Sequence, residues 1–229
     1  MNKLAIIGYG KMGRMIDQLA PQFDFETIAR VDMNDDIAPA SQADAAIEFS
    51  TPEGAIANIE KLAEMRIPMV VGTTGWLKQM ERASAAVDKH SALMVWSPNF
   101  SIGVNVFSRL VREAAHLLKD QPEYGAWAWE IHHHTKKDAP SGTLIKLIDE
   151  MKAGGFTRSI DASSSRAGAH PGTHEVGFDS AADTITLRHS ARSREGFARG
   201  ALKAAQWVVS NRDKTGVFEF SDILFGGKS

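Results

Sequence analysis

Short apolar runs alternate with amphipathic stretches through the first hundred residues. The apolar runs occupy residues 4–7, 27–31, 45–50, 68–71 and 92–96. Each has the length and composition of a strand that is buried in a parallel sheet. The stretches between them predict helices over residues 11–19, from Pro52 and near Trp76. Strand and helix therefore alternate, which predicts an α/β fold with an N-terminal Rossmann-type, doubly wound parallel sheet.

The pattern changes after residue 100. Helices are predicted over 104–119, 144–151 and 200–209, and strands over 126–131, 174–178 and 184–188, while residues 217–220 are expected to return the chain to the first domain. Residues 161–172 are rich in loop formers and predict a surface loop or a mobile lid. These elements predict a second α+β domain built on an open mixed or antiparallel sheet, with helices on one face. We therefore expect a first domain over 1–100, a second over 101–207, and a segment over 208–229 that returns to the first.

A glycine motif follows the first predicted strand directly. In Gly8-Tyr-Gly-Lys-Met-Gly13, the first glycine permits a tight turn, the second lets a pyrophosphate approach the backbone, and the third lets the helix pack against the strand. Asp32 ends the second predicted strand, nineteen residues after Gly13, where a carboxylate binds a ribose diol. The alternatives are a plain glycine turn and a solvated Asp32. The context of strand, helix and acid favours a dinucleotide site.

Two further loops follow predicted strands of the same sheet. They are residues 72–75, Gly-Thr-Thr-Gly, and residues 97–100, Ser-Pro-Asn-Phe. Ligands of such sheets bind beyond the carboxyl ends of the strands, so both loops could line the nicotinamide end of a cofactor. The alternative is ordinary turn chemistry.

Residues 130–143, Glu-Ile-His-His-His-Thr-Lys-Lys-Asp-Ala-Pro-Ser-Gly-Thr, are the most informative stretch of the chain. They connect a predicted strand to a predicted helix. Pro140 suits the first turn of that helix, with Asp138 or Ser141 as the capping side chain. The amides of residues 141–143 would then be free donors at a positive helix end, which is a place for a carboxylate.

The same stretch carries groups that exchange protons. Imidazoles titrate near neutral pH, and lysine supplies positive charge or, if it is desolvated, a proton. Alternation in an extended segment would place His132, His134 and Lys136 on one side and His133 on the other. A basic surface loop and a zinc site are the alternatives. Zinc is disfavoured because the chain has no cysteine and no histidine pair at helical i, i+4 spacing, so we expect no metal.

The composition is that of a globular protein, because 43% of the 229 residues are apolar and 24% are charged. The formal net charge of -2 gives no general reason to expect nucleic acid or a membrane surface as a partner. The absence of cysteine excludes disulfides and thiol chemistry. The first residues lead straight into a folded motif instead of a signal peptide, and no apolar run approaches the roughly 20 residues that span a bilayer. We expect a cytoplasmic protein.

Four motifs together resemble the dihydrodipicolinate reductase family, also called 4-hydroxy-tetrahydrodipicolinate reductases. They are residues 8–13, 71–75, 97–105 and 130–143, and the likeness runs nearly end to end. The resemblance implies NAD(P)H-dependent reduction of 4-hydroxy-tetrahydrodipicolinate to tetrahydrodipicolinate in lysine and diaminopimelate biosynthesis. It also implies a cofactor on the first domain, a small dicarboxylate substrate on the second domain, and a homotetramer formed through the second domain.

The resemblance assigns roles to individual residues. His132 and Lys136 are the catalytic acid/base groups, and His133, Lys136, Gly142 and Thr143 hold the substrate carboxylates. The cofactor-binding positions are Gly8, Tyr9, Gly10, Lys11, Met12, Gly13, Asp32, Gly72, Thr73, Thr74, Ser97, Pro98, Asn99 and Phe100.

Two departures from the family pattern matter. Where some members have an arginine-bearing motif in the catalytic loop, this chain has His134 and Thr135, to which we assign no role. Many members carry an arginine after the ribose acid, whereas Met33 follows Asp32 here, which favours NADH slightly over NADPH. Lys11 could still reach a 2′-phosphate.

Other functions remain open from the residues alone. One is another two-domain amino-acid dehydrogenase, such as an aspartate or homoserine dehydrogenase. The other is a redox sensor that binds NAD without chemistry. An uncovered apolar sheet face in the second domain would need a partner, which makes a homo-oligomer plausible.

Overall fold

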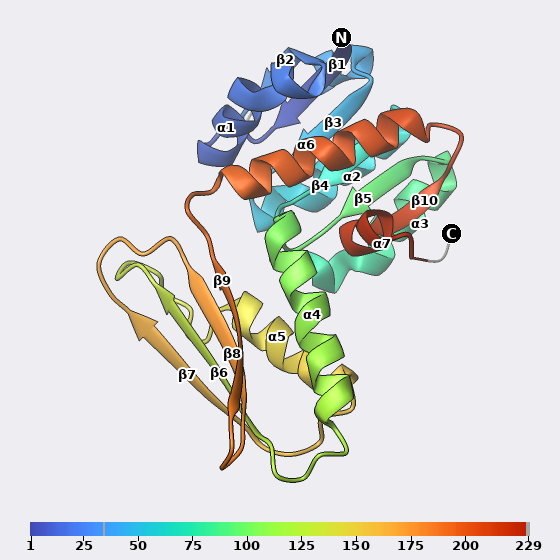
Figure 1. The fold of residues 1–229 in the computed structure, drawn as a ribbon. Helices are drawn as coiled ribbons and strands as arrows, with labels where there is room; N and C mark the ends of the chain where they lie inside the picture. Colours follow the sequence, from blue (N-terminus) through green and yellow to red (C-terminus); the bar gives the residue numbers. More distant parts are fainter. Residues whose placement is uncertain (34, 228–229) are drawn as a thin grey trace. The chain divides into compact units, whose positions relative to one another are not determined.

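The computed structural model describes residues 1–33 and 35–227, and the chain divides into two compact units (Figure 1). The first unit comprises Met1–Ile102 together with Glu195–Ser229, and the second comprises Gly103–Arg194. Within the described residues, no helix combines the length and apolarity needed to cross a membrane.

The first unit is built on a six-stranded sheet with the order β10-β5-β4-β3-β1-β2, in which every pair is parallel. Its strands are β1 (Asn2–Ile7), β2 (Phe25–Val31), β3 (Ala45–Glu48), β4 (Met69–Val71), β5 (Leu93–Trp96) and β10 (Gly216–Glu219). Its helices are α1 (Lys11–Leu19), α2 (Pro52–Glu64), α3 (Met80–His90), α6 (Glu195–Ser210) and α7 (Phe220–Phe225). Short 3-10 turns occupy Ala20–Phe23, Ala38–Gln42 and Leu77–Gln79.

Helices cover both faces of this sheet, because side chains alternate along its buried strands. In β1, Leu4 and Ile6 belong to the core beneath α1 and α6, while Ala5 and Ile7 belong to the core beneath α2 and α3. The predicted α/β fold with a doubly wound parallel sheet is confirmed.

Helix α6 corrects the expected domain limits. The sequence predicts its residues in the second domain and a return of the chain at about residue 208, but α6 packs on the first unit, so the return begins at Glu195. Its buried face is made of small residues such as Ala198, Ala201 and Ala205. A Cβ at Gly200 would lie 1.7 Å from the carbonyl oxygen of Phe100, so this helix approaches the first unit's backbone too closely for a larger residue.

The second unit is built on a four-stranded mixed sheet with the order β7-β6-β8-β9. Its elements are α4 (Ile102–Leu118), β6 (Gly125–His132), α5 (Gly142–Ala153), β7 (Ile160–Arg166), β8 (Thr173–Asp179) and β9 (Thr184–Ser190). Strands β6 and β7 are parallel, and the other two pairs are antiparallel. Helices α4 and α5 cover one face, where Ala126, Ala128, Val176 and Phe178 join the core. The predicted α+β unit on an open mixed sheet is confirmed.

The prediction of a loop over residues 161–172 is wrong for its first half. Residues 160–166 form β7, an edge strand whose backbone pairs with β6 from Ile160 to Arg166. Its central residues are exposed, so they show no apolar alternation that would reveal a strand. Backbone hydrogen bonds to β6 determine its conformation instead.

Candidate functional site

The glycine motif forms the turn between β1 and α1. Gly8 has a φ of +92°, and a Cβ there would lie 2.2 Å from the carbonyl oxygen of Phe49. A Cβ on Gly13 would lie 2.2 Å from the carbonyl oxygen of Gly8, so this glycine allows α1 to approach the strand. A Cβ on Gly10 would meet no atom of the described residues within 4 Å. Gly8 and Gly13 therefore serve packing, while the backbone at Gly10 is open to a ligand.

A pocket of about 410 Å³ lies beyond the carboxyl ends of β1, β3 and β4. It is lined by Gly10, Lys11, Met12, Phe49, Ser50, Pro52, Gly72, Thr73 and Thr74. The chain proceeds from β1 to β2 on one side and to β3 on the other, so the strand order reverses here, which is where such sheets bind ligands. No side chain of the described residues caps α1, so its first-turn amides are available to an anion. These features fit the pyrophosphate of a dinucleotide.

The pocket brings together six of the predicted cofactor residues and adds three that the sequence analysis missed. The six are Gly10, Lys11, Met12, Gly72, Thr73 and Thr74. Phe49, Ser50 and Pro52 follow β3 directly. The rule that selected the loop after β4 applies equally to β3, so this signal was present in the sequence.

Buried Glu48 binds residues of this pocket through hydrogen bonds. The Ser50 N–H donates to Glu48 Oε1 at 3.1 Å, the Ser50 hydroxyl donates to the same oxygen, and the Ser50 N–H also donates to Thr73 Oγ1 at 2.8 Å. Burial raises the pKa of Glu48, although the hydrogen bonds from Ser50, Thr73 and Asn58 oppose the rise. Glu48 has no predicted role from the sequence.

Other predicted cofactor residues lie outside this pocket's lining. Tyr9 donates its hydroxyl to Asp17, which also accepts two hydrogen bonds from Arg30 at 2.8 and 2.9 Å. Asp32 is exposed at the end of β2, and its Oδ1 accepts the N–H of Met33 at 2.8 Å. A ribose-binding role for Asp32 stays a prediction.

The loop after β5 is held by its own hydrogen bonds. The Ser97 hydroxyl donates to the carbonyl of Asn99 at 2.9 Å and accepts the N–H of Asn99 at 3.1 Å. Phe100 is buried, with its ring against those of Phe49 and Phe220. Its side chain is therefore part of the core, and contacts of Ser97, Pro98 and Asn99 with a cofactor stay predictions.

In the second unit, residues 130–143 connect β6 to α5, as predicted. Ser141 caps the helix, because its Oγ accepts the N–H of Leu144 at 3.2 Å. Asp138 is not the cap, and Pro140 precedes the cap instead of lying in the first turn. The strand ends at His132, and the chain turns where the Lys136 N–H donates to the carbonyl of His133 at 3.1 Å. The expected alternation of His132, His134 and Lys136 therefore fails beyond β6.

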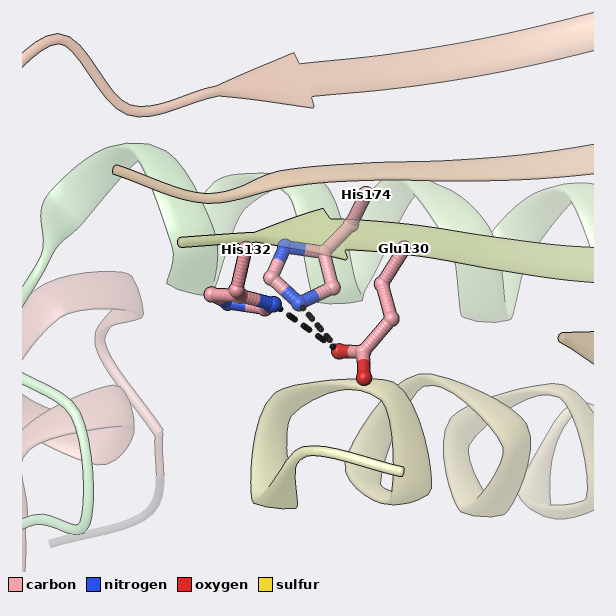
Figure 2. A group of neighbouring side chains, drawn as sticks. All are labelled: Glu130, His132 and His174. Carbon is pink, nitrogen blue, oxygen red and sulfur yellow. Dashed lines mark ion pairs between the residues drawn. The ribbon is translucent and has the colours of Figure 1, made fainter. Parts of the chain in front are cut away.

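A buried carboxylate lies at the centre of this unit's polar residues (Figure 2). Glu130 is fully buried, and it accepts the Ser141 N–H at 2.9 Å, the Ser164 hydroxyl at 2.9 Å and the Arg166 guanidinium at 3.0 Å. The Ser141 hydroxyl donates to its second oxygen, Oε2. Burial would raise the pKa of Glu130, but the hydrogen bonds from Ser141, Arg166 and Ser164 lower it to about 2. Glu130 is therefore ionised.

Two imidazoles approach the same oxygen of Glu130. His174 Nε2 lies 3.3 Å and His132 Nδ1 lies 3.5 Å from Oε2, and the rings meet edge to face (Figure 2). Burial and the neighbouring charge of His132 lower the pKa of His174 to about 4. Burial also lowers the pKa of His132, which Glu130 opposes. Both histidines are therefore largely neutral at pH 7.

Lys136 is half-buried, whereas the first residue of α5 is exposed. Lys136 Nζ contacts both carboxylate oxygens of Asp138, at 2.7 and 2.8 Å. His133 Nδ1 lies 2.7 Å from the hydroxyl of Thr135. Gly142 is exposed, and a Cβ there would meet nothing within 4 Å, so the first turn of α5 is open to an anion.

Glu130, His132 and His174 have the donor types of a zinc site, and their ligand atoms lie within 4.8 Å of one another. Glu130, however, already accepts three hydrogen bonds from side chains and one from a backbone amide. One of these donors is the guanidinium of Arg166, whose positive charge opposes a divalent ion. The hydrogen bonding favours a network of side chains over a metal site.

Comparisons with known proteins agree with this architecture. Models of the dihydrodipicolinate reductase N-terminus and C-terminus match residues 2–100 and 103–224. A 4-hydroxy-tetrahydrodipicolinate reductase of Christiangramia forsetii is 36% identical over 236 residues, which cover 96% of this chain and 97% of the relative. Another, of Methanoregula boonei, is 33% identical over 256 residues and 98% of each chain.

Solved structures show the same fold at low identity. A dipicolinate-bound dihydrodipicolinate reductase from Paenisporosarcina sp. TG-14 matches with a TM-score of 0.80 at 19% identity, over 97% of this chain and 99% of the other. An aspartate dehydrogenase from Thermotoga maritima matches with a TM-score of 0.53 at 12% identity, over 91% and 97%. Because the family models and the relatives span nearly the whole chain, the protein belongs to the dihydrodipicolinate reductase family and is an oxidoreductase that uses a nicotinamide cofactor.

Proposed function

We propose that the protein reduces 4-hydroxy-tetrahydrodipicolinate to tetrahydrodipicolinate with NADH or NADPH, in lysine and diaminopimelate biosynthesis. The observation that carries this proposal is the loop between β6 and α5. It presents an imidazole, an ammonium group and an open helix N-terminus within residues 132–143. A doubly anionic ring that must gain a proton requires this combination.

The residues of this loop have two roles, substrate binding and proton transfer. His133, Lys136, Gly142 and Thr143 bind the substrate carboxylates, the last two through the N-terminal turn of α5. His132 and Lys136 exchange the proton, because the reaction consumes one hydride and one proton and releases water. The bound nicotinamide cofactor supplies the hydride.

For the cofactor we propose a slight preference for NADH. Asp32 is followed by Met33, an exposed residue that offers no charge to a 2′-phosphate. Lys11 lines the pocket and is exposed, so its ammonium group keeps NADPH within reach. Dual use of both coenzymes follows from these opposing features.

We also propose a homotetramer formed through the second unit. The sheet face opposite α4 and α5 carries Trp127, Trp129 and Ile131, which are only half-buried in the single chain. A Cβ on Gly177 would lie 2.1 Å from the indole of Trp127, so this ring lies across the sheet and adds apolar surface. Such a face is stabilised when another subunit covers it. The cytoplasmic location stays a prediction.

The proposal is tested by NADH consumption with substrate made fresh from pyruvate and aspartate semialdehyde by the preceding synthase. We expect turnover that requires both precursors and the synthase. Rapid NADH oxidation with aspartate semialdehyde alone would favour an aspartate or homoserine type of dehydrogenase. NADH binding without turnover on any dicarboxylate would favour a redox sensor.

A further inference from the structure

We propose that Glu130 is a positioning residue of the reaction, which holds His132 with Nδ1 inward and Nε2 as the atom that exchanges the proton. It does so through one carboxylate oxygen that His132 shares with His174 (Figure 2). This inference rests on the proposed role of His132. Glu130, His174 and Arg166 have no predicted part in the chemistry from the sequence.

The carboxylate of Glu130 is fixed in orientation. Arg166 and Ser164 donate to Oε1, at 3.0 and 2.9 Å, together with the N–H of Ser141. The Ser141 hydroxyl donates to Oε2. Donors on both oxygens leave the group no freedom to rotate, so Oε2 stays directed at the imidazoles of His132 and His174.

The two nitrogens of His132 have different surroundings. Nδ1 is buried, lies 3.5 Å from Glu130 Oε2, and has no hydrogen-bond partner among the described residues. Nε2 lies beside Gly172, where an added Cβ would be 3.0 Å away. A carboxylate next to Nδ1 favours the tautomer with the proton on Nδ1, which leaves Nε2 to take up and release a proton. Because residue 172 is glycine, no side chain fills the space beside Nε2.

The protonation of His132 depends on the charges that face it from every side. These are Glu130 on β6, Lys136 and Asp138 in the following loop, Arg166 on β7 and His174 on β8. Burial, Lys136 and Arg166 lower the pKa of His132, whereas Glu130 and Asp138 raise it. His174 is kept neutral by burial and by its neighbours His132 and His189, so it brings no further positive charge at neutral pH. Glu130 therefore raises the pKa of His132 and stabilises its protonated form.

The test is a titration of the histidine side chains by NMR, alongside a pH profile of kcat. In Glu130→Gln the amide keeps the shape of the side chain and removes its charge, so the pKa of His132 is expected to fall by about one unit. The optimum of kcat should move to lower pH by a similar amount. Glu150→Gln is the matched control, because Glu150 lies on α5 and pairs with Arg112 at 3.8 Å. EDTA in all samples removes metal ions that could bind the three side chains.

Arg166→Gln should shift the pKa of His132 in the opposite direction. This variant tests the inference if Glu130→Gln does not fold. Removal of this cation should raise the pKa of His132. A purely structural role of Glu130 predicts a lower kcat at every pH and no shift of the His132 titration. An unshifted His132 in both variants, or a shift in the same direction in both, would overturn the inference. A shifted His132 with an unshifted kcat profile would also overturn the inference, because His132 would then take no part in the proton transfer, and the fault would lie in the proposed role of His132.

Discussion

At the scale of single residues, the three glycines of the first motif have separate tasks. Gly8 and Gly13 lie against backbone oxygens, while Gly10 has open space around it. The sequence motif predicted all three roles, because each follows from the steric demands of a strand, a turn and a helix around a pyrophosphate. It could not reveal which position tolerates a methyl group.

Alanine substitutions should separate these tasks. Gly10→Ala should leave the free energy of unfolding within about 0.5 kcal/mol of wild type, since Gly10 has a negative φ and no close neighbour. Its methyl group should weaken NADH binding by about tenfold or more. Gly13→Ala should lower the free energy of unfolding by roughly 1–3 kcal/mol, because the added Cβ meets a backbone oxygen. Urea denaturation and fluorescence titration with NADH measure both effects, and equal effects of the two variants on stability would contradict the assignment.

The buried cluster around Glu130 shows where sequence reasoning stops. Alternation along β6 places Glu130 and His132 on the same side as Ala126 and Ala128, which is the buried side of the strand. Their partners Arg166 and His174 lie more than thirty residues further along the chain. Only the pairing of β6 with β7 and β8 brings them together.

At the scale of elements, the start of α5 depends on Ser141. Its hydroxyl caps the helix and donates to Glu130, and its N–H donates to the same carboxylate. The helix that presents Gly142 and Thr143 is therefore fastened to β6 by an ionised side chain. The sequence predicted the helix and offered Ser141 as a cap, but not its attachment to Glu130.

This attachment predicts a loss of stability in acid. The folded pKa of Glu130 is about 2, against 4.5 for the free side chain, so its contribution is complete above pH 4.5 and is lost as the pH falls towards 2. Between pH 6 and pH 3 the loss from this group should be about 2 kcal/mol. Urea denaturation of Glu130→Gln should show a correspondingly shallower pH dependence, while Glu150→Gln should parallel the wild type. A Glu130→Gln curve parallel to wild type would refute the attachment.

The edge strand β7 was missed for a physical reason. Residues 161–164, Asp-Ala-Ser-Ser, are exposed, so no buried face imposes an apolar pattern on the sequence there. Strands β1, β3 and β4 were predicted because burial on both faces requires continuous apolar runs. An apolar pattern in the sequence reveals a buried strand, but it does not reveal an exposed strand that is held only by backbone hydrogen bonds.

At the scale of the whole molecule, the chain leaves the first unit after Ile102 and re-enters it at Glu195. The exit was predicted to within two residues, because the alternating pattern stops there. The re-entry was placed too late, since the pattern of α6 shows that the helix is buried but not which unit buries it.

The proposed tetramer predicts the effect of a charge on the open face of the second sheet. Thr186 is exposed on β9 opposite Gly177, beside the half-buried tryptophans of that face. Thr186→Asp should leave the fold of the subunit intact and shift a tetramer towards smaller species, whereas Thr186→Ser should not. Sedimentation velocity measures the distribution, and an unchanged tetramer in Thr186→Asp would exclude this face as the interface.

The central claim is that His132 and Lys136 carry the proton chemistry in the second unit while the first unit binds the cofactor. The most direct measurement determines kcat in the synthase-coupled assay and the NADH dissociation constant for His132→Ala and Lys136→Ala, with exposed Lys137→Ala as the control. We predict that kcat falls by about 100-fold or more in the first two variants, with NADH affinity retained, and that Lys137→Ala behaves as wild type. Normal turnover with weakened NADH binding in His132→Ala or Lys136→Ala would contradict the account.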